Sequence, residues 1–162
     1  MKGQEEPGPI LSLGSNLGNR VRFLEMAKEE LGKIFEERKA SAIYESAAVD
    51  YIQQPPFLNQ LIEYKKTDKK PNQILDIILE IEKKFGRTRD IRRGPRTLDI
   101  DLIFLGELEI SSDKLQVPHP RWIERSFIYW PLHELPSAQM LKRLFFPKKS
   151  EVPNNLTPYK PG

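Results

Sequence analysis

A chain of 162 residues that is 38% hydrophobic and 30% charged has the length and composition of one soluble globular domain with room for a real core. The absence of cysteine excludes disulfides and thiolate metal sites, and the presence of only two histidines argues against a histidine-rich zinc site. A net charge of +3 favours anionic ligands without requiring nucleic acid. No apolar run reaches membrane-spanning length and residues 1–8 lack a signal-peptide core, so we expect a cytoplasmic protein with no membrane partner.

The first predicted elements are a strand and an amphipathic helix. Residues 9–15 form a short apolar run, typical of a buried strand, and end in a tight loop of glycine and asparagine. Asn19 is suited to cap the helix that we expect over residues 20–35. One apolar stripe runs along this helix through Leu24, Ala27, Leu31 and Ile34.

Two more strands are predicted next, over residues 39–46 and 57–65. Pro55 and Pro56 end any pairing between them, because proline cannot donate to a sheet ladder. Asn59 shares a face of the later strand with apolar neighbours. Its amide is therefore either a satisfied structural group or a group that binds a ligand.

A second helix is predicted over residues 71–85. Pro71 fits its first position and Gly86 fits the position after its end. Its buried stripe comprises Ile74, Ile77, Ile78, Ile81 and Phe85.

A basic loop and an acidic strand follow this helix. The loop carries Arg87, Arg89, Arg92, Arg93 and Arg96. In the strand expected over residues 97–105, one face holds Leu98, Ile100, Leu102 and Phe104. Asp99 and Asp101 share the other face, roughly 7 Å apart along the strand. A divalent cation would relieve their repulsion, and Mg²⁺ suits carboxylates together with substrate phosphates.

Both the arginine-rich loop and the aspartate pair have alternative explanations. An arginine-rich loop can be a solvated surface or a nucleic-acid patch, and Asp-x-Asp can protect an exposed edge strand from aggregation. The direct succession of the two favours a site for a metal and a polyanion.

The remaining chain predicts smaller elements. A short strand is expected over residues 108–110, and His119 lies in a rigid VPHP turn. A helix is expected over residues 123–135, interrupted at Pro131, and residues 137–162 are expected to form a peripheral or loosely ordered tail.

The order β-α-β-β-α-β predicts an α+β, ferredoxin-like fold with an antiparallel sheet. Both helices are expected on one face, which leaves the Asp99/Asp101 face for ligands. We expect a single domain over residues 1–162 with a core of about 9–135.

The separate motifs together resemble the 6-hydroxymethyl-7,8-dihydropterin pyrophosphokinase family. They are LSLGSNLGN, FLN, GRTR, GPRTLDIDLIFL and VPHP, followed by Arg125-Ser126-Phe127. The resemblance runs from about Ile10 to Leu135. It implies an enzyme of folate biosynthesis that transfers diphosphate from ATP to the hydroxymethyl group of a reduced pterin and releases AMP.

The resemblance also implies residue roles. Asp99 and Asp101 match ligands of two Mg²⁺ ions, and Arg87 and Arg96 match arginines that hold the transferring group. Asp101 is also the nearest candidate for a general base, although metal ligation would make it a poor one. The implied ATP contacts are Glu82, Arg89, His119 and Arg125. The implied pterin contacts are the Asn59 amide, the rings of Phe57 and Phe127, and the backbone of Ser46, Ala47 and Val49.

This sequence departs from the family pattern at a few positions. The loop after Gly86 is one residue shorter, Arg93 stands where some members carry tryptophan, and Ala47 and Pro120 replace residues common in the family. The partners we expect are small molecules rather than nucleic acid, and we expect a monomer. The alternative function is a ferredoxin-like nucleic-acid or metal-binding module without catalysis, but neither central strand shows the exposed aromatic pattern of an RNA-binding sheet.

Overall fold

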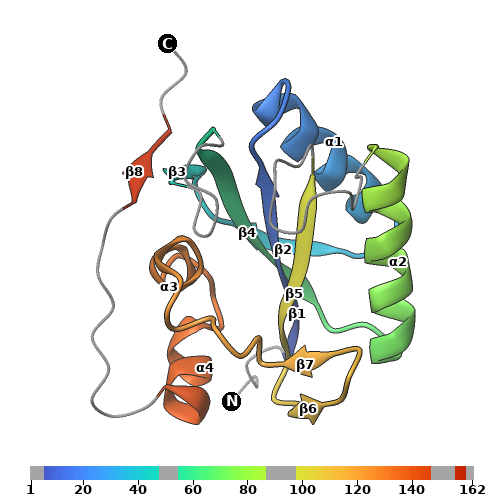
Figure 1. Ribbon diagram of the computed structural model, residues 1–162. Coiled ribbons are helices and arrows are strands. Elements are labelled where there is room, and N and C mark those ends of the chain that lie inside the picture. The colour runs from blue at the N-terminus through green and yellow to red at the C-terminus, as the bar shows by residue number, and fades with distance from the viewer. Residues whose placement is uncertain (1–5, 48–54, 87–97, 147–155, 160–162) are drawn as a thin grey trace.

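The computed structural model describes residues 6–47, 55–86, 98–146 and 156–159 (Figure 1). In chain order the elements are β1 (Pro7–Ser15), α1 (Arg20–Gly32), β2 (Glu37–Ala40), β3 (Tyr44–Ser46), β4 (Phe57–Lys65), α2 (Pro71–Lys84), β5 (Asp99–Leu105), β6 (Ile110–Ser111), β7 (Gln116–Val117), α3 (Ser126–Leu132), α4 (Ala138–Phe145) and β8 (Thr157–Pro158). Six of these strands form one antiparallel sheet in the order β5-β1-β4-β3-β8, with β2 also paired to β4. The expected α+β class with an antiparallel sheet is confirmed.

Helices α1 and α2 cover one face of the sheet (Figure 1). Asn19 caps α1 as predicted, since its side chain accepts a hydrogen bond from the backbone N–H of Arg22 at 3.2 Å. Gly86 has the positive φ of 77° expected just after α2. The two helices and the sheet bury a common core that includes Leu11, Leu13, Leu24, Leu31, Leu58, Ile62, Ile74, Ile78, Ile100 and Leu102.

The two predicted core helices share one face, as expected. The opposite face, which the prediction left to ligands, is partly covered by α3 and α4. Leu141 of α4 is fully buried, so residues 138–145 belong to a second core and not to a loose tail. This face carries apolar side chains of its own, and such a surface must be covered by another layer. The second core includes Ile10, Leu61, Ile103, Phe104, Trp122, Ile128, Leu132 and Leu141.

A β-bulge changes the face of one predicted core residue. The pairing of β1 with β5 shifts at Ile103, which is the extra residue on β5. Phe104 therefore leaves the face of Leu102 and packs against Trp122 in the second core, with ring centroids 5.2 Å apart. The strict alternation predicted for this strand is wrong beyond Leu102.

The end of α1 also differs from the prediction. The helix ends at Gly32, and the backbone N–H of Ile34 then bonds to the carbonyl of Leu31 at 3.0 Å. This tighter turn rotates Ile34 out of the apolar stripe, and its side chain is 40% exposed.

The strand predicted over residues 39–46 divides into β2 and β3. Between them, hydrogen bonds from β4 to the hydroxyl and the carbonyl of Ser41 interrupt the regular strand pairing. Its hydroxyl accepts from the N–H of Leu61 at 3.0 Å, and its carbonyl accepts from the amide of Gln60 at 2.8 Å. β3 is therefore a separate strand of three residues.

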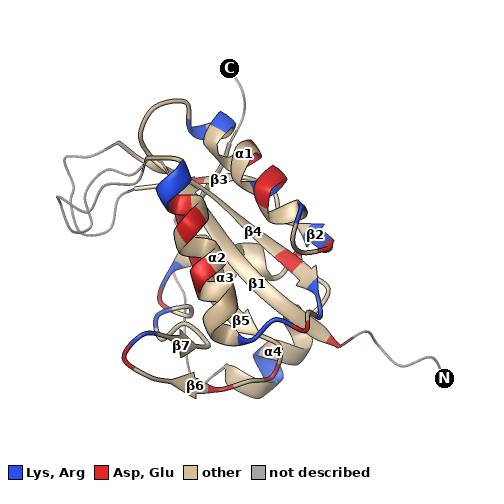
Figure 2. Cartoon of the chain, turned by 90° about the vertical axis from the view of Figure 1, so that its right-hand side faces the viewer, with Lys and Arg blue, Asp and Glu red and all other residues tan. Residues whose placement is uncertain are grey.

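Charged residues lie mainly on the helices and connecting segments, and the central strand β1 carries none (Figure 2). Lys83 and Lys84 occupy the last turn of α2, where cations interact favourably with the helix dipole. None of the helices in the described ranges is long and apolar enough to cross a bilayer.

Candidate active site

The pairing of three strands places Asp99 and Asn59 in one row across the sheet. Gly14 of β1 pairs with Asp99 of β5 on one side and with Asn59 of β4 on the other. Paired residues share a face and neighbouring strands lie about 4.8 Å apart, so these side chains leave the same face about 10 Å apart. It is the face opposite α1 and α2. The predicted metal and pterin residues are thus within reach of one set of bound substrates.

Gly14 keeps the middle of this row open. A Cβ at this position would lie 3.5 Å from the Asn59 side-chain oxygen and 3.5 Å from the ring of Phe57. These are ordinary contact distances, but any longer side chain would project between Asp99 and Asn59. Gly14 therefore places no side chain between Asp99 and Asn59.

The two aspartates meet the requirements of a magnesium site. Both are half-buried on β5, and Asp101 pairs across the sheet with Ser12 as Asp99 does with Gly14. Two carboxylates beside neutral residues supply hard oxygen ligands and leave other coordination positions for water and phosphate. Among the described residues there is no cluster of three or more acidic, histidine or cysteine side chains.

Glu82, predicted on the nucleotide side, bonds to the backbone of the aspartate strand. Its side chain is 2% exposed and accepts a hydrogen bond from the N–H of Ile100 at 2.8 Å. β5 lies at the edge of the sheet formed by the described strands, and this N–H belongs to the residue between Asp99 and Asp101. Glu82 thereby ties α2 to the strand that carries both aspartates.

His119 lies near Asp99 and Arg125 in the folded chain. Its backbone N–H donates to the carbonyl of Ile103 at 2.8 Å, which attaches the VPHP turn to β5. Burial lowers the pKa of His119 to about 4, with Arg125 and Arg121 acting in the same direction and Asp99 opposing them. The imidazole is neutral at pH 7, and its Nδ1 accepts from the N–H of Arg121 at 3.1 Å. The proton is therefore on Nε2, which can donate to a phosphate or ribose oxygen.

Arg125 and Phe127 lie at the start of α3. The guanidinium carbon of Arg125 is 5.8 Å from the ring centroid of Phe127. The Nε of Arg125 is buried and has no acceptor among the described residues. A buried donor without a partner is costly, so this atom is available to an anionic ligand. α3 packs against β3 and β4, the strands of Ser46 and Asn59.

Two of the residues predicted to contact pterin form a hydrogen-bonded pair. The Asn59 amide donates to the hydroxyl of Ser46 at 2.7 Å, and both side chains are less than a tenth exposed. Phe57 is half-buried at the start of β4, and Ala47 is exposed just after β3. The predicted residues Val49, Arg87, Arg89 and Arg96 lie outside the described residues.

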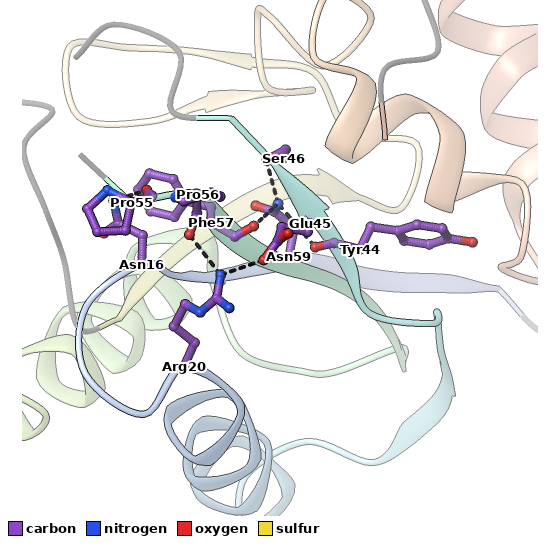
Figure 3. Close-up of polar contacts among 9 residues, drawn as sticks. All are labelled: Asn16, Arg20, Tyr44, Glu45, Ser46, Pro55, Pro56, Phe57 and Asn59. Atoms are coloured by element: carbon purple, nitrogen blue, oxygen red, sulfur yellow. Dashed lines mark hydrogen bonds and ion pairs between the residues drawn. The ribbon is translucent and has the colours of Figure 1, made fainter. Parts of the chain in front are cut away.

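Two residues near the pterin side were missed in the sequence. Asn16 is 1% exposed, and its amide donates to the carbonyl of Pro55 at 3.0 Å. Arg20 donates to Glu45 and to the carbonyl of Pro56 (Figure 3). Asn16 lies in the conspicuous glycine–asparagine loop, but Arg20 has no local signal because it reads as an ordinary first residue of a helix.

Comparison with known proteins identifies the family. The family model described as 7,8-dihydro-6-hydroxymethylpterin-pyrophosphokinase (HPPK) matches residues 10–137. The 2-amino-4-hydroxy-6-hydroxymethyldihydropteridine pyrophosphokinase of Bacillus subtilis is 40% identical over 127 residues, which cover 77% of this chain and 75% of the relative. The Aquifex aeolicus protein of the same name is 38% identical over 125 residues, which cover 77% of this chain and 78% of the relative.

Other relatives are much longer than this chain. The chain spans 17% of the length of the folic acid synthesis protein fol1 of Pneumocystis carinii, with 41% identity over 126 residues. A solved structure of Plasmodium falciparum HPPK-DHPS with STZ-DHP shares the fold with a TM-score of 0.62 and 13% identity, over 85% of this chain and 41% of that chain. The resemblance inferred from the separate motifs is confirmed, and the chain belongs to the 7,8-dihydro-6-hydroxymethylpterin-pyrophosphokinase family.

Proposed function

We propose that this chain transfers the diphosphate group of ATP to the hydroxymethyl oxygen of 6-hydroxymethyl-7,8-dihydropterin, as a step of folate biosynthesis. The products are AMP and the pterin diphosphate. The observation that carries the proposal is the row from Asp99 through Gly14 to Asn59, because it joins a carboxylate site for metal and phosphates to an amide site for a heterocycle. The family match favours this function over a nucleic-acid or metal-binding module without catalysis.

On the phosphate side, Asp99 and Asp101 would hold two Mg²⁺ ions, which when bound neutralise charge on the triphosphate. His119 would donate a hydrogen bond from Nε2 to the nucleotide, because its pKa of about 4 keeps the ring neutral. Arg125 would meet a nucleotide oxygen through the Nε that lacks an acceptor among the described residues. Arg87, Arg89 and Arg96 are proposed from the family motif to bind the phosphates, and Glu82 to support this side from α2.

On the pterin side, the buried Asn59 would read polar groups at the edge of the ring system, while Phe57 and Phe127 would stack on its faces. Ser46 holds the Asn59 amide in place through the 2.7 Å hydrogen bond. The backbone of Ala47 and Val49 is proposed to line the same edge.

The transfer itself needs the hydroxymethyl oxygen in line with the β-phosphorus and the bridging oxygen to the α-phosphorus. A bond forms from the hydroxymethyl oxygen to that phosphorus and the hydroxyl proton is lost to a base or to solvent. The bond to the bridging oxygen breaks with its electron pair staying on that oxygen, so AMP leaves. Such reactions depend on positioning and charge stabilisation more than on covalent help. Asp101 remains the nearest candidate for a general base, but a metal-bound carboxylate would be a poor one.

Several finer features belong to the same proposal. We infer a ferredoxin-like arrangement, because β5, β1 and β4 stand in antiparallel order with β2 and β3 beyond them, and α1 and α2 share a face. We also propose one pyrophosphokinase domain over residues 1–162, acting as a cytoplasmic monomer. Size-exclusion chromatography with light scattering tests the monomer.

Identification of the nucleotide product tests the function. The protein, Mg²⁺, ATP and 6-hydroxymethyl-7,8-dihydropterin should yield AMP and pterin diphosphate in one-to-one ratio, as read by chromatography. A reaction without pterin is the control for ATP hydrolysis. ADP as the main product, or no pterin-dependent turnover, would refute the proposal.

A further inference from the structure

Arg20 connects the two strands that carry the pterin-side residues. Its Nη1 donates to the carboxylate of Glu45 in β3 at 2.8 Å. The same nitrogen donates to the carbonyl of Pro56, just before β4, at 3.0 Å (Figure 3). One side chain at the start of α1 therefore contacts both strands at their shared end.

The pairing of β3 with β4 is short at this end of the sheet. It is supplemented by the pairing of β3 with β8 and by the hydrogen bonds of Asn59 to Ser46 and of Asn16 to Pro55. β3 has three residues, and its pairing with β4 ends at Ser46 opposite Phe57. Strands in globular proteins usually have five or six residues, so a three-residue ladder fixes its partners weakly. Glu45 directly precedes Ser46, and Pro56 directly precedes Phe57. The Arg20 contacts thus lie beside the last pair of the ladder.

Arg20 contacts the sheet from the face opposite the row of Asp99, Gly14 and Asn59. Glu45 pairs with Leu58, whose side chain belongs to the core under α1 and α2. Ser46 and Asn59 lie on the other face, because they are one residue out of phase with Glu45 and Leu58. Arg20 therefore approaches the sheet from the side of α1, opposite the face on which the pterin contacts are proposed.

The burial of the pair separates it from an ordinary surface ion pair. The side chains of Arg20 and Glu45 are 25% and 36% exposed. In the neighbouring pair Arg22–Glu25 they are 64% and 60% exposed, and the charged atoms are 3.9 Å apart. A partly buried pair is less screened by solvent and salt, so the contact of Arg20 has the greater capacity to hold its partners.

We propose that Arg20 is a positioning residue for pterin binding, which holds the ends of β3 and β4 so that Ser46, Asn59 and Phe57 keep their relative placement. The inference rests on the proposed function. Loss of Arg20 should reduce affinity for pterin and leave the metal and nucleotide side, built on β5, largely unchanged.

Calorimetry and steady-state kinetics on matched variants test the inference. Arg20→Ala should raise the Kd and KM for pterin about threefold to tenfold, the range expected for loss of a partly buried contact of this kind. The KM for ATP should change by less than about twofold. Arg20→Lys keeps the charge and three donors and should recover part of the pterin affinity. Arg22→Ala, which removes the exposed pair in the same helix, is the control and should match the wild type.

A double-mutant cycle tests whether Glu45 supports pterin binding through its contact with Arg20. Arg20→Ala and Glu45→Ala should weaken pterin binding less than additively when combined, because each removes the same contact. If Arg20→Ala does not fold, Arg20→Lys and Glu45→Gln decide the question through the same pterin Kd. Equal losses for pterin and ATP, or a lower melting temperature with unchanged pterin affinity, would overturn the inference. Absence of pterin-dependent AMP formation in the wild type would instead count against the proposed function.

Discussion

Asp99 and Asp101 stand on one face of β5, as a pattern of alternating residues predicts, and we propose that they form the phosphate side of the site. Each is half-buried next to neutral partners on β1, so neither carboxylate is needed to neutralise a cation from that strand. Two aspartates are unusual on an otherwise apolar strand, and we propose that they are there to hold a metal ion.

We predict that Asp99→Ala and Asp101→Ala each abolish turnover and leave the fold intact. The apo protein should be as stable as the wild type or slightly more stable, because each change removes repulsion between like charges. Turnover assays and thermal melts measure the two effects. Asp113→Ala, at an exposed position between β6 and β7, is the control. Near-normal turnover in either active-site variant would contradict the metal assignment.

His119 predicts a pH dependence of stability. Burial lowers its pKa from the ordinary 6.5 to about 4 in the folded chain, so the unfolded chain binds a proton between these values and the folded chain does not. The stabilising contribution of neutral His119 is complete above about pH 6.5 and is lost as the pH falls toward 4.

His119→Gln should therefore lose less stability than the wild type between pH 7 and pH 5, as measured by denaturant unfolding at each pH. His133→Gln, at an exposed site, serves as the control. An identical pH dependence in His119→Gln and the wild type would show that the imidazole is not buried in the neutral form.

The contact between α2 and β5 shows how one helix supports the strand that carries Asp99 and Asp101. Among the described strands β5 pairs only with β1, and Glu82 satisfies a backbone N–H on the other edge of β5. The sequence pattern placed residues 71–85 in a helix with an apolar stripe, and Glu82 did not belong to that stripe. Its buried position is explained by its hydrogen bond to the edge of β5, which only the sheet order reveals.

Glu82→Ala should lower the free energy of unfolding by about 1–3 kcal/mol, because it leaves the N–H of Ile100 buried without its acceptor. Glu82→Gln keeps a side-chain oxygen and should lose less. Chemical denaturation compares the three proteins. Equal stability of Glu82→Ala and the wild type would mean that solvent reaches this edge of β5.

At the scale of the whole molecule, the second core packs α3 and α4 against the sheet face that also carries Asp99, Gly14 and Asn59. Figure 1 shows these helices on the other side of the sheet from α1 and α2. Glu63 reinforces this union, because its fully buried carboxylate accepts hydrogen bonds from the N–H and hydroxyl of Ser137, at 3.0 and 2.8 Å, and pairs with Arg38. The segment after residue 137 is therefore part of the folded body through α4.

Leu141→Ala should destabilise the protein by about 2–5 kcal/mol, since Leu141 is fully buried in the second core. Leu144→Ala, in the same helix but 50% exposed, should change stability by less than about 0.5 kcal/mol. Thermal or chemical unfolding distinguishes the two. Similar small losses of stability in both variants would mean that α4 is a peripheral segment and not part of the second core.

Local patterns in the chain were sufficient for the main elements and for the family. The cap at Asn19, the glycine after α2, the apolar stripes and the alternation around Asp99 depend on residues close in sequence, so they could be predicted from it. The exit of Phe104 from its expected face could not, because a bulge depends on the pairing of β5 with β1.

The arrangement of the site depends on contacts between distant segments. Asp99, Gly14 and Asn59 form one row only after three strands have paired in a particular register, and a shift of one residue would move each side chain to the other face. Arg20 is unremarkable within its helix and gains a role only because β3 and β4 meet beside it. The chemical types of the site residues could be recognised in the sequence. Their positions relative to one another were decided by strand register and packing, because these involve residues far apart along the chain.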